Sequence, residues 1–216
     1  MDYAIARQHM VDSQVRTNRV TDERLITAIR TLPRERFVPD RVRARAYLDD
    51  DVEIAPGRYL MEPMVTGRLI QVADVQAEDM VLAVGAGTGY AAALLAQLAH
   101  TVVALESEQA LAQRASAAFA ELAIDNAVVV EGGLNAGCAK HAPYNVIYLD
   151  GAVEQVPAVL ANQLANGGRM VGVLLDRGVG RATLWLKTGT TISHRVLFDA
   201  NVALLPGFAA PAGFVF

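Results

Sequence analysis

The sequence predicts a single α/β domain of 216 residues built on a doubly wound, Rossmann-like open sheet. From residue 80 onward, short continuous apolar runs alternate with helical stretches, and the connections between them are short. Continuous apolar runs are typical of parallel strands that are buried on both faces. Strands that alternate with helices favour an open sheet covered by helices. We expect residues 1–55 to form a helical N-terminal elaboration and residues 56–216 to form the α/β core.

The N-terminal elaboration is predicted to contain an amphipathic helix followed by a loop. In "VTDERLITAIRTLP", residues 20–33, we expect Thr21 to cap the helix, apolar side chains to share one face, and Pro33 to end it. The stretch "LDDDVEIAPGRYLMEPMVTG", residues 48–67, is punctuated by prolines and a glycine, which predicts a loop. Its run of aspartates has no ligand spacing typical of a metal site and is expected to be an exposed turn.

The α/β core is predicted to contain five parallel strands and a final antiparallel pair. The parallel strands are expected at residues 80–85, 101–106, 127–133, 145–152 and 169–175. The helices between them are expected at residues 91–99, 107–124 and 156–168, with Ser107 capping the second and Gly167 closing the third. Two longer strands, at residues 182–189 and 192–204, have no helix between them. They are therefore expected to form an antiparallel pair at one edge of the sheet.

The turn after the first core strand, "VLAVGAGTGY" at residues 81–90, carries three glycines. Its G-x-G-x-G spacing differs from the dinucleotide fingerprint G-x-G-x-x-G, because Tyr90 stands where the third glycine would fall. Glu106 ends the second strand, and a carboxylate there can accept hydrogen bonds from both hydroxyls of a ribose. A glycine turn without phosphate-binding features, followed by a ribose-binding acid, predicts S-adenosylmethionine as the ligand. The alternative is that the glycines serve only a tight strand–helix turn.

Further polar and small residues fall at the carboxyl ends of the predicted strands. Ligands of open α/β sheets bind at these ends, near the point where the strand order reverses. The candidate cofactor-binding residues are Gly85, Ala86, Gly87, Thr88, Gly89, Glu106, Ser107, Gly132, Gly133, Leu134 and Asp150.

Four segments resemble the protein-L-isoaspartate O-methyltransferase family. They are "LPRERFVP" at residues 32–39, "VLAVGAGTGYAAALLAQLA" at 81–99, "HAPYNVI" at 141–147 and "VPAVLANQLANGGRMV" at 156–171. The resemblance implies a methyltransferase fold with S-adenosylmethionine as cofactor. It also implies an enzyme that methylates the free carboxylate of isoaspartyl residues in ageing proteins, as the first step of their repair. Its partner would be a peptide or protein substrate.

The loop that positions the substrate departs from the family pattern. The family reads roughly G-Q-T-I-S-Q-P, whereas residues 57–63 read "GRYLMEP". Met61 therefore stands in place of the serine and Glu62 in place of its polar neighbour, and both are candidate catalytic positions. A glutamate charge beside the substrate carboxylate would oppose binding, and a lost hydroxyl would weaken it. We therefore expect poor methylation of isoaspartyl peptides.

Three cofactor positions also differ from the family. The acid that usually ends the first strand is Ala83, and the aspartate that usually bonds the adenine is Gly133, with Asn135 close by. Asp150 stands where the family commonly has threonine. Two other functions remain open: a methyltransferase of the same fold with a different substrate, and a catalytically weak S-adenosylmethionine-binding scaffold.

Composition excludes several other classes of protein. The net charge of −4 gives no footprint for nucleic acid, and no apolar run approaches the roughly 18 residues that span a bilayer. Cys138 is the single cysteine, and the four histidines are scattered, so neither an internal disulfide nor a metal site is expected. The opening decapeptide is too polar for a signal sequence, which favours the cytoplasm. The oligomeric state is not predicted.

Overall fold

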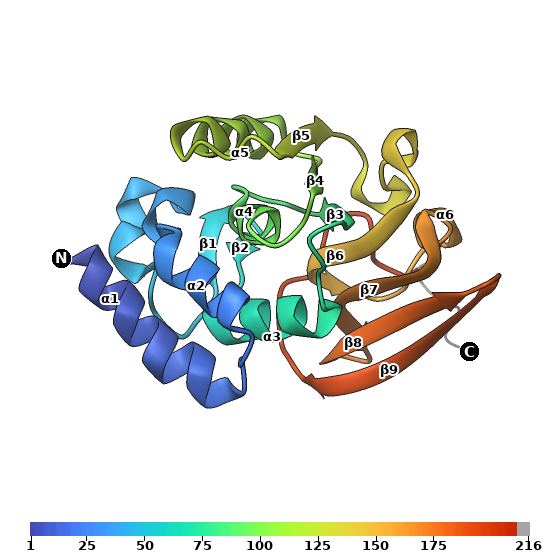
Figure 1. The fold of residues 1–216 in the computed structure, drawn as a ribbon, viewed down its shortest axis with the longest axis horizontal. Coiled ribbons are helices and arrows are strands. Elements are labelled where there is room, and N and C mark those ends of the chain that lie inside the picture. Colours follow the sequence, from blue (N-terminus) through green and yellow to red (C-terminus); the bar gives the residue numbers. More distant parts are fainter. Residues whose placement is uncertain (211–216) are drawn as a thin grey trace.

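The computed structural model describes residues 1–210, and its centre is one mixed seven-stranded sheet (Figure 1). The strand order is β5-β4-β3-β6-β7-β8-β9. The first five in this order are parallel, and β8 is antiparallel to both of its neighbours. The strands are β3 Met80–Val84, β4 Thr101–Glu106, β5 Ala127–Glu131, β6 Tyr144–Val153, β7 Leu164–Asp176, β8 Val179–Thr188 and β9 Thr191–Asp199. The predicted fold class and its antiparallel edge pair are confirmed.

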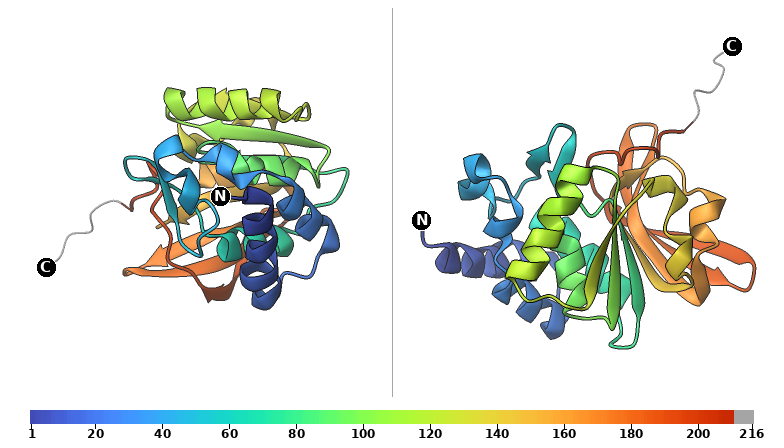
Figure 2. Two further views of the ribbon diagram at one scale, coloured as in Figure 1. Left: turned by 90° about the vertical axis from the view of Figure 1, so that its left-hand side faces the viewer. Right: turned by 90° about the horizontal axis from the view of Figure 1, so that it is seen from above.

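The sheet is buried on both faces, as the apolar runs predicted. Alternate residues of β3 enter different apolar clusters, Val81 and Ala83 on one face and Leu82 and Val84 on the other. One face is covered by the N-terminal region together with α3 Pro63–Ala73, α4 Tyr90–Ala96 and α5 Gln109–Glu121. In the right-hand view of Figure 2, the blue N-terminal helices and the green α5 lie together on this side.

The opposite face is covered by less helix than the predicted fold implies. Its helical cover consists of α6 Ala158–Ala161 and short 3₁₀ turns. Leu205 and Phe208, from the segment after β9, are buried in the same apolar cluster. Phe208 of the C-terminal tail therefore covers the domain's own sheet, while residues 211–216 lie outside the described part of the chain.

The N-terminal region is helical, and one of its predicted details is wrong. It contains α1 Tyr3–Met10 and α2 Glu23–Thr31, followed by 3₁₀ turns. The residue that caps α2 is Asp22, whose carboxylate accepts a hydrogen bond from the Arg24 N–H. The neighbouring Thr21 instead donates its N–H to the Gln71 side chain at 2.6 Å. Both residue types favour this position, so only the tertiary contact decides between them.

The predicted loop at residues 48–67 is mostly regular structure. It contains the antiparallel hairpin of β1 Val52–Ala55 and β2 Arg58–Leu60, and then the start of α3. Pro63 was expected to interrupt regular structure, but it is the first residue of α3. Proline is favoured there because its missing N–H has no partner in the first turn of a helix.

The predicted helix at residues 156–168 is also largely wrong. Only α6, four residues long, is helical, and β7 begins at Leu164. Gly167 lies within β7 at φ +78° instead of closing a helix. The Gln163 side chain helps to end α6, since its oxygen accepts from the Cys138 N–H at 2.8 Å and its amide donates to the Ala136 carbonyl at 2.7 Å.

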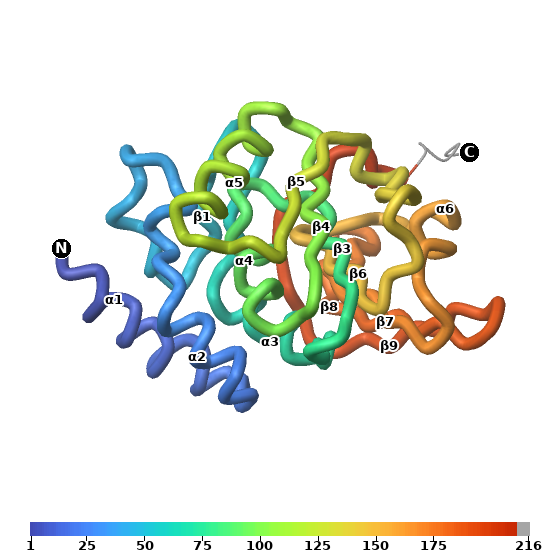
Figure 3. Tube along the Cα trace, turned by 45° about the horizontal axis from the view of Figure 1, so that its top comes forward, coloured from blue at the N-terminus to red at the C-terminus, as the bar shows by residue number. Residues whose placement is uncertain are grey.

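The chain runs from the N-terminal helices at one end of the molecule to the β8–β9 hairpin at the other (Figure 3). Among residues 1–210, no helix is both long enough and apolar enough to cross a membrane.

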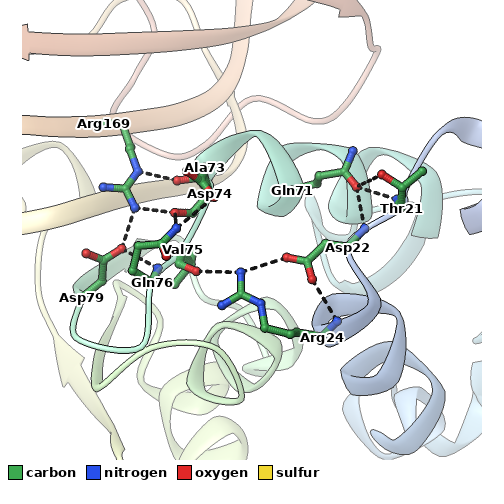
Figure 4. Close-up of polar contacts among 10 residues, drawn as sticks. All are labelled: Thr21, Asp22, Arg24, Gln71, Ala73, Asp74, Val75, Gln76, Asp79 and Arg169. Carbon is green, nitrogen blue, oxygen red and sulfur yellow. Dashed lines mark hydrogen bonds and ion pairs between the residues drawn. The ribbon is translucent and has the colours of Figure 1, made fainter.

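Polar contacts fasten the N-terminal helices to α3 and its following turn (Figure 4). The Gln71 side-chain oxygen accepts from the N–H groups of Thr21 and Asp22. Arg24 donates to the Val75 carbonyl at 3.2 Å and to Asp22 at 3.1 Å. The bonds to Gln71 and to the Val75 carbonyl join segments about fifty residues apart.

Arg169 on β7 holds the other side of the same turn (Figure 4). Its guanidinium donates to the Ala73 and Asp74 carbonyls and forms an ion pair with Asp79 at 2.6 Å. Asp79 is 6% exposed, so its charge is poorly hydrated.

The variant Arg169→Gln is expected to lower the free energy of unfolding by about 1–3 kcal/mol, because a buried carboxylate and two carbonyls lose their donor. Urea denaturation measures this as a lower midpoint with an unchanged slope. The matched control is Arg177→Gln, whose side chain is 93% exposed and which should change stability little. Equal stabilities for the two variants would contradict the assigned role of Arg169.

Candidate cofactor site and substrate loop

The glycine turn between β3 and α4 has the backbone geometry that its glycines suggested. Gly85, Gly87 and Gly89 have φ values of +77°, +57° and +97°, in the left-handed region that side chains disfavour. The N–H groups of Gly85 and Ala86 both donate to the Leu105 carbonyl at the end of β4. The turn therefore brings its backbone close to the carboxyl end of the neighbouring strand.

Glu106, the predicted ribose ligand, is fully buried and paired with an arginine of the same chain. Arg58, from β2, donates to both carboxylate oxygens at 2.7 Å each. The N–H groups of Gly87, Ser107 and Glu108 also donate to this carboxylate, at 2.7, 2.7 and 3.0 Å. Burial by itself would raise the pKa of Glu106, but Arg58 and these backbone donors hold that pKa below its usual range. The carboxylate is thus charged and fully hydrogen-bonded.

Apolar side chains fill the space above the glycines. A Cβ built on Gly85 or Gly151 would lie 2.6 or 2.8 Å from the Leu205 side chain, and one on Gly87 would lie 2.8 Å from Ile54. A cavity of about 10 Å³ lies beside Leu205. It is lined by Gly57, Arg58, Tyr59, Met61, Asp150, Gly151, Ala203, Leu204 and Leu205.

The candidate residues therefore have positions and hydrogen-bonding groups that suit an S-adenosyl compound, but Arg58, Ile54 and Leu205 occupy the space beside them. Sites for small molecules of this size have volumes of several hundred Å³. The site in the described conformation is closed.

The remaining predicted cofactor residues lie around the same strand ends, most of them with partners of their own. The Thr88 hydroxyl donates to the Phe37 carbonyl, and Ser107 is exposed and does not cap α5, which begins at Gln109. The Gly132 N–H donates to the Glu106 carbonyl. Gly133 is exposed, Leu134 is buried, and the Asn135 amide donates to the Gly207 carbonyl at 3.2 Å.

Met61 and Glu62 lie between β2 and α3, on the same side of the sheet as the glycine turn. Met61 is 2% exposed, and its carbonyl accepts from the fully buried Arg34 at 2.7 Å. Arg34 stacks 4.8 Å above the Tyr90 ring centroid, so the family motif at residues 32–39 supports the substrate loop from below.

Glu62 faces an acidic groove and does not pair with Arg58, whose carboxylate partners are Glu106 and Glu108. The groove has a volume of about 530 Å³ and is lined by Glu62, Gly178, Val179, Gly180, Asp199, Ala200 and Asn201. Partial burial, and then the charge of Asp51 and its neighbours, raise the pKa of Glu62. Asp51 also accepts the Glu62 N–H at 2.7 Å.

Sequence reasoning missed Arg58 and Leu205. The sequence did contain a signal for Arg58, because this residue replaces a glutamine of the family pattern in the loop at residues 57–63. Leu205 had no motif, because it reaches the site only through the segment after β9. Within residues 1–210, no group of three or more His, Cys, Asp or Glu side chains could hold a metal ion.

Comparisons with known proteins agree with this arrangement. The family model for protein-L-isoaspartate(D-aspartate) O-methyltransferase matches residues 5–189. A protein-L-isoaspartate O-methyltransferase of Koribacter versatilis is 40% identical over 169 residues, which are 78% of this chain and 76% of the relative. One from Roseiflexus castenholzii is 34% identical and covers 97% of this chain and 96% of its own length.

Two solved structures share the fold. A protein-L-isoaspartate O-methyltransferase has a TM-score of 0.82 at 22% identity, covering 93% of this chain and 66% of its own. A Plasmodium falciparum protein, described as a putative member in complex with S-adenosyl-L-homocysteine, has a TM-score of 0.78 at 18% identity, covering 92% and 97%.

The sheet, the glycine turn and Glu106 define the class of S-adenosylmethionine-dependent methyltransferases of Rossmann-like fold. Within that class, the chain belongs to the protein-L-isoaspartate(D-aspartate) O-methyltransferase family.

Asp150 gives a stability prediction at this site. Asp150 is partly buried, and this loss of hydration is the main cause that raises its pKa to about 8. Because the unfolded pKa is near 4, the folded state holds an extra proton between these values, so stability falls as pH rises from about 4 to about 8.

The variant Asp150→Asn is expected to remove this fall and to be more stable than the parent at pH 8 by about 1 kcal/mol or more. Thermal denaturation between pH 5 and pH 8.5 measures the difference. Asp176→Asn, at an exposed position, is the control and should keep the parent's profile. A parent-like profile for Asp150→Asn would mean that Asp150 titrates normally.

Proposed function

We propose that this protein methylates the free carboxylate of isoaspartyl residues in peptides or proteins, at the loop that carries Met61 and Glu62, and that it does so slowly. The observation that carries the proposal is the family match over residues 5–189 in a chain whose glycine turn and Glu106 meet at the strand ends. A cytoplasmic repair role is proposed with it, supported by the single cysteine and by the family.

The reaction places modest demands on this chain's own side chains. A carboxylate is already a nucleophile at neutral pH, so no general base is required. The protein's contribution is to hold the acceptor carboxylate at the right distance and angle. A missing positioning group therefore lowers the rate without abolishing the chemistry.

Two features of the substrate loop oppose an acidic acceptor. Met61 offers no hydroxyl, and losing such a partner to a carboxylate costs about 1–3 kcal/mol. Glu62 adds a like charge, which costs up to about 4 kcal/mol at 4 Å and an effective dielectric of 20. The groove beside the loop also carries Asp199, so its charge disfavours an isoaspartyl carboxylate.

The closed cavity favours a second candidate function, a family member that serves as a scaffold with little or no turnover. Labelled methyl incorporation into an isoaspartyl peptide separates the two, since the scaffold would show none at any enzyme concentration.

The double variant Met61→Ser with Glu62→Gln is expected to raise methyl transfer to an isoaspartyl peptide by roughly two orders of magnitude, because it restores a hydroxyl partner and removes a repulsive charge. Labelled methyl incorporation is compared with that into the normal aspartyl peptide. The control is Glu53→Gln, an exposed acid on β1 that should leave the rate unchanged. Robust turnover by the unaltered protein would refute the view that this loop is disabled.

A pH dependence is expected from Glu62. Because its pKa is raised by burial and by Asp51, Asp49 and Asp50, lowering the pH protonates Glu62 before the acceptor carboxylate, which has an ordinary pKa. Methyl transfer should therefore rise toward acid in the parent relative to Glu62→Gln. The measurement is the ratio of the two rates as the pH is lowered, and a constant ratio would count against the charge argument.

A further inference from the structure

The β1–β2 hairpin puts an arginine where a cofactor's ribose would bind. Glu106 receives two bonds from Arg58 and three from backbone N–H groups. A carboxylate offers about four lone-pair sites, so no acceptor capacity is left for two ribose hydroxyls. A ribose can take this position only if Arg58 leaves it.

Arg58 is itself held in place without any ligand. Besides its bidentate pair with Glu106, it donates to the Gly85 carbonyl at 3.3 Å and contacts Glu108 at 3.3 Å. It is 5% exposed, and bidentate arginine–carboxylate pairs of this geometry are among the strong hydrogen-bonded contacts in proteins. In the closed arrangement, the guanidinium of Arg58 and the carboxylate of Glu106 therefore both have hydrogen-bond partners.

A second side chain, Leu205 from the segment after β9, also closes the site. Leu205 is fixed to the end of β6, because its N–H donates to the Ala152 carbonyl and the Ala152 N–H donates to the Ala203 carbonyl, both at 2.8 Å. Its side chain occupies the space that the missing Cβ atoms of Gly85 and Gly151 leave free. The absence of a Cβ at these glycines lets another group lie close to the backbone, and here that group is the Leu205 side chain.

We infer that Arg58 competes with the cofactor for Glu106, and that the site is closed from within until the β1–β2 hairpin withdraws. The ligand class is an adenine nucleoside with free vicinal ribose hydroxyls. The inference rests on the proposed function, because it takes S-adenosyl compounds as the ligands of this site. Substitution of Arg58 should strengthen binding, whereas an ordinary binding-site arginine would weaken it when removed.

The test is titration calorimetry of the full chain with S-adenosyl-L-homocysteine. Arg58→Gln, which introduces the residue that the family pattern has here, should bind at least tenfold more tightly than the parent. Arg58→Lys keeps the charge but loses the bidentate geometry and should lie between them. The matched control is Arg45→Gln, at an exposed arginine 3.6 Å from Asp50, which should leave the affinity unchanged.

The double variant Arg58→Gln with Glu106→Gln identifies the cause of the gain. It should lose the added affinity, because the freed carboxylate is what binds the ribose. Leu205→Ala, with Arg58 intact, should give a smaller gain. If thermal denaturation shows that Arg58→Gln does not fold, Arg58→Lys and Leu205→Ala decide the question: tighter binding by either supports the inference, and unchanged binding by both overturns it.

The outcomes separate this inference from the proposed function. Equal affinities for the parent and Arg58→Gln overturn the inference, and methyl transfer by the parent would then leave the proposed function intact. Conversely, a tenfold gain in affinity without methyl transfer to an isoaspartyl peptide supports the inference and counts against the proposed substrate.

Discussion

The Arg58–Glu106 ion pair is the contact on which the state of this site depends. It joins the N-terminal hairpin to the carboxyl end of β4, and it also ties the glycine turn through Gly87 and the Gly85 carbonyl. A charge as deeply buried as Glu106 must be paired, since an unpaired one costs several kcal/mol. Either an arginine or a set of neutral donors can satisfy it, and here the arginine is present.

The same contact explains how the backbone of the methyltransferase fold can be preserved while little space is left for a cofactor beside the glycine turn. The sheet has the predicted order of parallel and antiparallel strands, the glycine turn is left-handed, and Glu106 lies at the end of its strand beside that turn. The closure comes from side chains that the backbone does not dictate, Arg58 from β2 and Leu205 from the segment after β9. Preserved backbone geometry and an accessible site are therefore separate properties.

In the loop that carries Met61 and Glu62, the residues that fix the backbone differ from those whose side chains could affect catalysis. Arg34, which packs on the Tyr90 ring, donates a hydrogen bond to the Met61 carbonyl, so the loop's path is fixed by buried contacts. The Glu62 side chain lines the neighbouring groove and takes no part in these buried contacts, so it can differ without disturbing that path. This accounts for a loop that keeps the family's glycine and proline at residues 57 and 63 although Met61 and Glu62 differ from the family pattern.

The sequence by itself determined the alternation of strands and helices, the antiparallel edge pair, the glycine turn and the family, because these depend on local periodicity and short motifs. The prediction of a break at Pro63 was wrong because proline also suits the first turn of a helix. The prediction of a helix at residues 156–168 was wrong because the chain from Leu164 onward pairs with the sheet. Only the tertiary structure could show that Glu106 is already occupied. Its partner lies 48 residues away in the chain, and no local pattern specifies which distant charge a buried carboxylate will meet.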